Sequence, residues 1–396
     1  MCSSDLAQVG NATDPYLLTQ TYSFSQGGTG GFVSRDGVQP AANLKPEISS
    51  ATEVGLDLRL FGGRLGLDLT YYSTNTVNQL LTLPLAPASG FSSQFINAGK
   101  INNKGIEIQL TGKILRNGPL TWDMAVNFAR NTNKIVELHP DIKIAFLAGG
   151  FGRTAGPVVA EGGSFGDMFA RAWATDAQGR YVVDANGKPR SGVWNFDNNT
   201  VRDVERKIGN FNPDFTLGIS NQFNYKNFTA SFLFDGRFGG TMTSGSEANF
   251  AFDGNAAYTT NFRDGGWVLP AVTATGETNT KAINAETFWT TVSNGRYSWG
   301  EFFTYSTTNV RLREMSIGYN IPMPASIFIK NARLSLVGRN LFFVYRGYAT
   351  LDIPGVERRK LPFDPDVNIG AGALQGAEYG NLPSTRTIGF NLKLGF

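Results

Sequence analysis

One stretch of the sequence, residues 53–72, limits what this chain can fold into. Its first arm reads EVGLDLRL and its second arm reads RLGLDLTYY, and Gly62-Gly63 lies between them. In both arms an apolar residue alternates with a polar or small one. Since side chains on a strand point to opposite faces in turn, each arm has an apolar face and a charged face. Such a hairpin fits a soluble sheet on a core, or a membrane barrel with a wet interior.

The same alternation recurs in three further pairs of segments and in a final segment, residues 386–396. Within residues 308–322 the apolar phase slips by one residue near Arg313 and Glu314, which predicts a β-bulge. A weak first strand is expected at residues 16–24. The sequence predicts about ten strands, or about twelve if residues 132–210 contain a further pair.

Connection lengths distinguish the two folds. Within each pair the strands are joined by a short turn, whereas long segments separate one pair from the next. Outer-membrane barrels sort their loops in this way, with short periplasmic turns and long external loops, and a soluble sandwich has no reason to do so. The sequence therefore predicts an all-β chain that forms part of an antiparallel transmembrane β-barrel in the cell outer membrane, with a periplasmic C-terminus.

Composition agrees with this fold and argues against other classes. Apolar residues make up 41% of the chain and charged residues only 17%, which is low for a soluble surface. A net charge of +3 is too small to indicate a nucleic-acid partner. The single cysteine, Cys2, excludes a disulfide framework. The sequence has no run of 18 apolar residues that would predict a transmembrane helix, and MCSSDLAQVG lacks the features of a signal peptide.

Two sets of side chains are candidate functional residues. Charged residues in phase with the polar face are expected to line the lumen, where they would pair with each other or meet a solute or a plug. Aromatic residues in the long segments would pack within the loops, stack on sugar rings or contact a partner. The lumen candidates are Asp57, Arg59, Asp68, Glu107, Asp123, Arg333, Arg339 and Lys393, and the loop aromatics are Trp194, Trp267, Trp289 and Trp299.

No catalytic constellation is present in the sequence. One histidine, His139, and one cysteine leave little for a His-based triad, and no phosphate-binding or dinucleotide-binding fingerprint occurs. Residues 364–368, DPDVN, place oxygen ligands at alternate positions but lack the glycine and distal glutamate of a calcium loop. Residues 184–187, DANG, lead to the same conclusion. We therefore expect no enzyme activity, no metal and no cofactor.

Several longer stretches carry a family resemblance. LKPEISSATEVGLDLRL, FINAGKINNKGIEIQL, GRNLFFVY and PSTRTIGFNLKLGF resemble the C-terminal barrel portion of SusC/RagA-type TonB-linked outer-membrane transporters. The resemblance implies that residues 16–396 belong to a larger plugged barrel, with the plug and the N-terminal strands absent. Residues 1–15 resemble nothing in the family and are expected to be a non-family or disordered stretch, with residues 1 to about 6 foreign to the native sequence.

The resemblance also implies a function and partners. A SusD-like surface lipoprotein would deliver nutrients such as oligosaccharides or peptides, and TonB–ExbB–ExbD would drive import through the missing N-terminal part. The lipid bilayer would surround the barrel. The positions that match the family's signal for the barrel-assembly machinery are Phe390, Leu392, Leu394 and Phe396. A passive porin and a surface adhesin or binding barrel remain the alternatives.

Overall fold

The computed structural model describes most of the chain. It covers residues 2–12, 17–27, 29–41, 44–138, 144–147, 155–191, 205–294, 298–324, 328–368 and 374–396. Among these residues, neither helix is long and apolar enough to cross a membrane.

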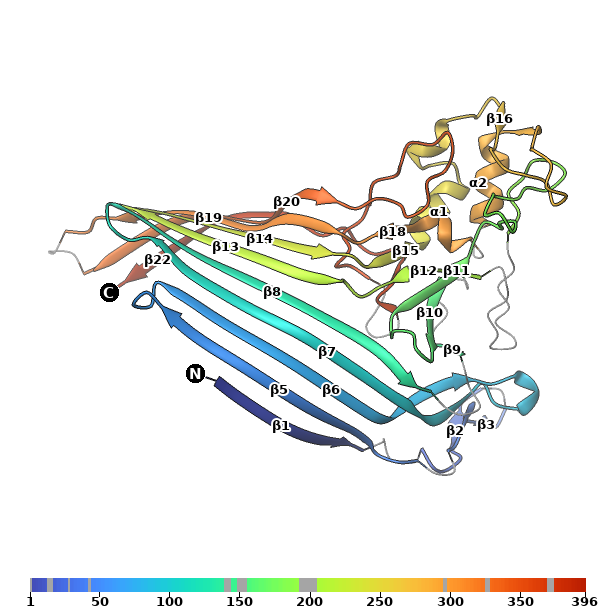
Figure 1. Cartoon of the computed structure of the whole chain (residues 1–396), viewed down its shortest axis with the longest axis horizontal. Helices are drawn as coiled ribbons and strands as arrows, with labels where there is room; N and C mark the ends of the chain where they lie inside the picture. Colours follow the sequence, from blue (N-terminus) through green and yellow to red (C-terminus); the bar gives the residue numbers. More distant parts are fainter. Residues whose placement is uncertain are drawn as a thin grey trace.

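A single large sheet dominates the structure and follows the order of the chain (Figure 1). Ten of its strands form one antiparallel path, and short β4 (Val38–Gln39) adds to β7 in parallel. The ten are β1 (Cys2–Asn11), β5 (Glu47–Leu60), β6 (Leu65–Pro84), β7 (Ser93–Leu115), β8 (Leu120–Glu137), β13 (Phe215–Tyr225), β14 (Phe228–Phe238), β19 (Asn309–Ile321), β20 (Asn331–Arg346) and β22 (Thr387–Gly395).

The sheet curves but does not close, because β1 and β22 each have one neighbour within the described residues. The predicted all-β antiparallel fold and the lower of the two predicted strand counts are therefore confirmed. Four connections of two to nine residues lie at one end of the sheet. The other five lie at the opposite end, and all of these except the eight-residue connection between β6 and β7 are much longer (Figure 1). At the turn between β5 and β6, Phe61, Gly62 and Gly63 all have positive φ, which explains the paired glycines there.

Cross-strand register gives the sheet one apolar face. Residues that lie directly opposite each other share a face, so one row can be followed from strand to strand. The apolar row at mid-height consists of Leu58, Leu67, Leu110, Val126, Ile219, Phe234 and Leu312. Leu56, Leu67, Ile108 and Leu392 are absent from the buried core clusters, and Leu392 is 60% exposed. This face is an open wall, as the barrel prediction requires.

Two details of the sequence prediction were wrong. The first strand of the sheet is β1, not residues 16–24. β2 (Tyr22–Ser25) pairs only with β3 (Phe32–Arg35), outside the main sheet. The alternation in CSSDLAQVGN is weak, but ten consecutive residues pair with β5, so ladder hydrogen bonds rather than apolar pattern define this strand.

The second error concerns residues 73–103, which belong to the long segments that were expected to separate one pair of strands from the next. β6 and β7 instead continue as a long hairpin, because TNTVNQLLTL pairs with residues 94–103. The ladder of paired residues is interrupted at Asn78, which has a positive φ. β8 pairs directly with β13, so the described part of residues 132–210 adds no strand pair to the wall, which decides between the two predicted strand counts.

Smaller elements lie among the long connections. They form a sheet of β9–β12, a three-stranded sheet, the pair β16–β17, two α-helices and three 3-10 turns. Their bounds are β9 (Ile144–Phe146), β10 (Ala155–Ala160), β11 (Asp167–Arg171), β12 (Glu205–Asn210), β15 (Thr241–Ser244), β16 (Trp267–Val268), β17 (Ala282–Ile283), β18 (Thr304–Ser306), β21 (Ala377–Glu378), α1 (Gly245–Phe252), α2 (Ala285–Ser293), η1 (Pro87–Ser89), η4 (Ala257–Thr260) and η6 (Gly300–Phe303).

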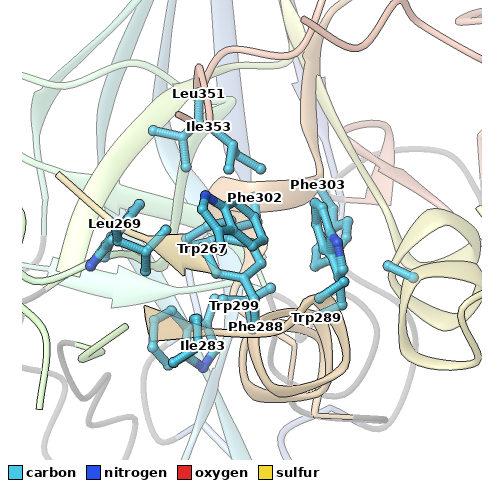
Figure 2. Close-up of a cluster of buried hydrophobic side chains, with 14 of the residues drawn as sticks. Trp267, Leu269, Ile283, Phe288, Trp289, Trp299, Phe302, Phe303, Leu351 and Ile353 are labelled. Carbon is cyan, nitrogen blue, oxygen red and sulfur yellow. The ribbon is translucent and has the colours of Figure 1, made fainter. Parts of the chain in front are cut away.

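Three of the long connections fold together into a unit that we call the loop domain, residues 155–191, 239–294, 298–308 and 347–368. Its core contains Trp173, Phe288, Phe302 and Leu351, which come from all three segments. Figure 2 shows the last three of these side chains. Helix α1 begins at the Ser244 cap, whose hydroxyl accepts the Glu247 backbone N–H. The loop domain therefore has its own apolar core at the end of the sheet opposite the short turns.

Candidate functional site

The second face of the main sheet is polar and forms the inside of the curve. Its mid-height row consists of Asp57, Asp68, Gln109, Asn127, Gly218, Asp235 and Arg311. A hollow of about 620 Å³ is lined by side chains from β6 through β19 on this face. Only the concave side of a curved sheet brings such distant strands to one hollow. We call this polar, concave face of the sheet the inner face.

The cross-strand register places all eight predicted lumen residues on the inner face. They divide into ion-paired residues and residues that line open space. Asp123 pairs with Arg116 at 2.8 Å and Arg339 with Glu314 at 3.1 Å, while Arg59 lies 3.5 Å from Asp57. These pairs are exposed, so each contributes about 0–1 kcal/mol. Their direct role in binding a solute stays a prediction.

The remaining lumen candidates lie at two places on the inner face. Asp68 and Glu107 line the hollow. Arg333 and Lys393 lie opposite each other on β20 and β22, toward the short turns, and Arg333 donates to the Thr229 hydroxyl. The structure thus brings two of the eight into the hollow and leaves six outside it.

An array of charged groups at one side of the hollow was not predicted. Arg311 is only 3% exposed and contacts Asp235 at 3.0 Å, Asp364 at 2.9 Å and Asp366. Arg313 contacts Asp235 at 2.6 Å and Asp366 at 2.9 Å. We call these five residues the arginine array. Since Asp364 and Asp366 lie in the loop after β20, the array attaches that loop to the wall.

A β-bulge lies within this array at Arg313. The register on both neighbouring strands shifts between Leu312 and Glu314, and the predicted bulge is confirmed. Arg311 and Arg313 are two residues apart on the strand, so they share a face, and both reach Asp235. The sequence signals were two arginines in RLRE and two aspartates in DPD, but nothing in the sequence indicated that they would meet.

The two oxygen-rich segments examined for calcium have other roles. Asp364 and Asp366 bind guanidinium groups in the arginine array. Asp184 Oδ1 accepts the backbone N–H groups of Asn186 and Lys188, at 2.9 and 3.0 Å, and so closes a turn. Within the described residues no group of three or more acidic, cysteine or histidine side chains is placed to hold a metal. His139 and Trp194 lie outside the described residues.

The other three candidate tryptophans are buried in the core of the loop domain (Figure 2). Trp267, Trp289 and Trp299 are 3%, 2% and 5% exposed. Trp267 stacks on Phe262, and Trp289 packs edge-on against Phe288. Packing therefore accounts for all three, and none offers an open ring face to a sugar.

A buried polar cluster lies beside this core. The Glu247 carboxylate accepts hydrogen bonds from Tyr258 at 3.1 Å and Tyr305 at 3.4 Å. Burial raises the pKa of Glu247, although both hydroxyls and nearby Arg359 act to lower it. Burial also raises the pKa of Tyr258 and Tyr305. Arg359 lies over the rings of both tyrosines. Because Arg359 follows β20 and the other three residues precede β19, the cluster joins the segment before β19 to the segment after β20.

The last strand presents its apolar side chains on the outer face. Phe390, Leu392 and Leu394 continue the rows of Leu336, Leu334 and Ala332 on β20. Phe390 is 80% exposed and Phe396 is 70% exposed, with the Phe396 ring 5.3 Å from Phe328. Since β22 is an edge strand within the described residues, its backbone groups on one side have no sheet partner there.

Comparison with known proteins agrees with this two-faced wall. Residues 7–144 match the family described as TonB dependent receptor-like, beta-barrel. TonB-dependent receptor P3 of Formosa agariphila is 30% identical over 366 residues, which are 89% of this chain and 34% of that protein. The chain belongs to the SusC/RagA-like family of TonB-dependent receptor barrels. TonB-dependent receptor SusC of Bacteroides thetaiotaomicron is 26% identical over 48% of this chain and 19% of its own length.

Solved structures of this family share the fold of the chain. The RagAB peptide importer in its open-open state aligns with 99% of this chain and 40% of its own chain, at a TM-score of 0.65 and 19% identity. The structure of the RagAB peptide transporter aligns at a TM-score of 0.64 and 20% identity, over 87% of this chain. The chain spans about a third of the length of the curated TonB-dependent receptors P3 and P26 that it matches.

Proposed function

We propose that this chain supplies part of the wall and external loops of a transporter that imports nutrients across the outer membrane by TonB-dependent transport. The observation that carries the proposal is the cross-strand register, which separates an apolar outer face from a charged inner face over ten strands. An apolar outer face is suited to lipid, and a charged inner face is suited to a wet lumen. Family membership supports the energy coupling.

The proposed partners follow from the same relationship. A SusD-like surface lipoprotein would deliver oligosaccharides or peptides to the loop side, and the similar RagAB structures are those of a peptide importer. TonB–ExbB–ExbD would act through the part of the protein outside this chain. The short turns and the C-terminus would lie in the periplasm. Phe390, Leu392, Leu394 and Phe396 would be read by the barrel-assembly machinery.

The experiment compares nutrient uptake by the parent strain, a strain without the gene, and a strain without TonB. We expect both deletions to abolish growth on the same oligomeric nutrient while growth on its monomer is unchanged. Uptake that persists without TonB would indicate a passive porin instead. Surface binding of the nutrient without uptake would indicate an adhesin or binding barrel.

A further inference from the structure

The outer face changes from apolar to polar at nearly the same level on four neighbouring strands, β5–β8. Toward the long connections, the row of Val54, Tyr71 and Ile106 is followed by two rows that contain no apolar side chain. The first row consists of Thr52, Ser73, Lys104 and Thr132, and the second consists of Ser50, Asn75, Asn102 and Lys134.

The height of the apolar part of this face sets the depth of the two polar rows. On β8 the apolar side chains extend from Leu120 to Phe128, which is about 27 Å along the strand. A strand tilt of about 40° reduces this length to about 21 Å in height, close to the ~25 Å apolar band of a membrane barrel. The two polar rows therefore lie at the level of lipid headgroups.

Four cations lie in these rows or beside them, on β7 and β8. Lys104 is the diagonal neighbour of Arg130 on one side and of Lys134 on the other, and such neighbours are about 7–8 Å apart. Lys100 continues the line by one more row. Lys104, Arg130 and Lys134 are exposed, and Lys100 is half-buried. We call these four residues the basic strip. Its two strands lie away from both open edges of the wall (Figure 1).

The basic strip has little compensation from carboxylates. Glu137 lies opposite Lys100, at the end of the strip nearest the long connections. Among the described residues, the ion pairs are formed by other cations. Like charges that are close on neighbouring strands repel each other. Because β5 and β6 present only uncharged side chains in the two polar rows, the strip should attract an anion from outside the protein.

We propose that the basic strip binds the phosphate groups of a phosphorylated glycolipid in the outer leaflet of the outer membrane. Arg130 holds two phosphate oxygens with its planar guanidinium group, and Lys104 and Lys134 add positive charge around the same headgroup. Basic clusters at this depth are suited to anionic headgroups. The acyl chains lie against the apolar rows that begin at Ile106 and Phe128. This inference rests on the proposed outer-membrane function, in which the long connections face outward.

A second copy of this chain is a poorer match for the same surface. In a two-fold symmetric contact the same patch of each copy meets its equivalent, so the basic strip would face another basic strip. A lipid phosphate carries the opposite charge and is already at the depth of the strip. Charge complementarity therefore favours the lipid.

The test measures lipid binding to the purified full-length protein in a neutral detergent by native mass spectrometry. The two probes are diphosphoryl lipid A and the same lipid after enzymatic removal of its phosphates. We expect the diphosphoryl form to bind about tenfold or more tightly, because each cation near an anionic headgroup strengthens binding about fivefold. Equal binding of the two forms would overturn the proposal. Complete displacement by inorganic phosphate would indicate a site for the free ion and would overturn it as well.

Lys104→Gln and Lys113→Gln form a matched pair of variants on β7. Lys104 lies on the outer face, whereas Lys113 lies opposite Asp123 on the inner face. We expect Lys104→Gln to weaken binding of diphosphoryl lipid A about fivefold and Lys113→Gln to leave it unchanged. Equal losses in the two variants would contradict the proposed site. Heat-modifiable migration checks that each variant is folded.

A combined variant amplifies the effect. Lys104→Gln, Arg130→Gln and Lys134→Gln together should weaken diphosphoryl lipid A about a hundredfold, because the contributions of the three cations multiply. The phosphate-free lipid should bind the combined variant as it binds the parent protein. A loss of the same size for both lipids would contradict a role for the phosphates.

A photo-reactive p-benzoylphenylalanine at position 132, which lies opposite Lys104, identifies the partner in living cells. We expect a cross-link to the glycolipid that is lost in the combined variant, whereas a cross-link to a second copy or to another protein in its place would overturn the proposal. Import is scored separately, as growth on a nutrient. If growth requires this gene and TonB but lipid binding ignores phosphate, the import function stands and the lipid site fails. If lipid binds as expected and no nutrient requires the gene, the lipid site stands and the import function fails.

Discussion

Arg311 Nη1 lies 2.9 Å from Asp364 Oδ2, and the two side chains are only 3% and 5% exposed. A buried pair is strongly destabilised when one partner is removed, because the other keeps an uncompensated charge. Replacing Arg311 leaves three carboxylates that shared one guanidinium group, with Arg313 alone to compensate them.

We therefore expect Arg311→Met to lower the free energy of unfolding by about 3–5 kcal/mol. Arg339→Met is the control, because its pair with Glu314 is 66% and 41% exposed and should be worth about 0–1 kcal/mol. Urea unfolding of the full-length protein in lipid vesicles measures both. Equal losses of unfolding free energy in the two variants would contradict the conclusion that burial makes the Arg311 pairs more important than the exposed Arg339 pair.

Neighbouring residues on β7 test which face meets lipid. Leu110 lies in the apolar row, and Gln109 lies on the inner face. We expect Leu110→Arg to destabilise the folded barrel by about 2–4 kcal/mol, because its charge would enter hydrocarbon. Gln109→Arg should cost far less. The folded fraction after reconstitution, read from heat-modifiable migration, compares them, and the reverse order would contradict the assignment of the faces.

The raised pKa of Glu247 predicts a pH dependence for the loop domain. Because the folded state binds the Glu247 proton more tightly than the unfolded state does, this group's stabilising contribution is complete below its unfolded pKa. That contribution is lost as pH rises through the folded pKa. We expect cleavage of the loop domain by proteinase K to be faster at pH 7.5 than at pH 5.

Glu247→Gln provides the internal reference for that measurement. The variant cannot titrate at this position, so the ratio of wild-type to variant cleavage rates should rise with pH. This ratio removes the pH dependence of the protease itself. A ratio that is constant from pH 5 to pH 7.5 would show that the pKa of Glu247 is the same in the folded and the unfolded state.

The position of β1 can be tested by a disulfide. Ser4 and Val54 lie directly opposite each other, at a separation that a disulfide can bridge. In a Cys2→Ser background, the pair Ser4→Cys and Val54→Cys should cross-link on mild oxidation. Ser4→Cys with Leu58→Cys should not, because Leu58 lies four residues further along β5. Mass spectrometry of the oxidised protein identifies the linkage.

Much of the wall could be predicted from sequence because a strand's faces follow a period of two. The arms at Leu56 and Leu67, the glycine turn at residues 62–63 and the bulge at Arg313 all follow from that period. β1 does not, because residues 2–11 alternate only weakly, and within the described part of the chain β5 is their one strand neighbour. Its pairing depends on backbone hydrogen bonds, which leave no apolar pattern in the sequence.

The site was harder to predict than the wall. Asp68 and Glu107 were expected to face the lumen, and the register places both beside the hollow. Asp235, Arg311 and Asp364 were not identified, because their roles depend on contacts between strands and a loop far away in the chain. Periodicity assigns a residue to a face, but it does not reveal which distant segment packs against that face.

The extra residue in β19 has a consequence for how this strand can change. Beyond Arg313, the bulge directs Glu314 and Ser316 to the inside and Met315 and Ile317 to the lipid side. Deleting one residue there would reverse both assignments and place a carboxylate against hydrocarbon. Length variation at this position is therefore tolerated only when the following half of the strand changes its polarity pattern with it.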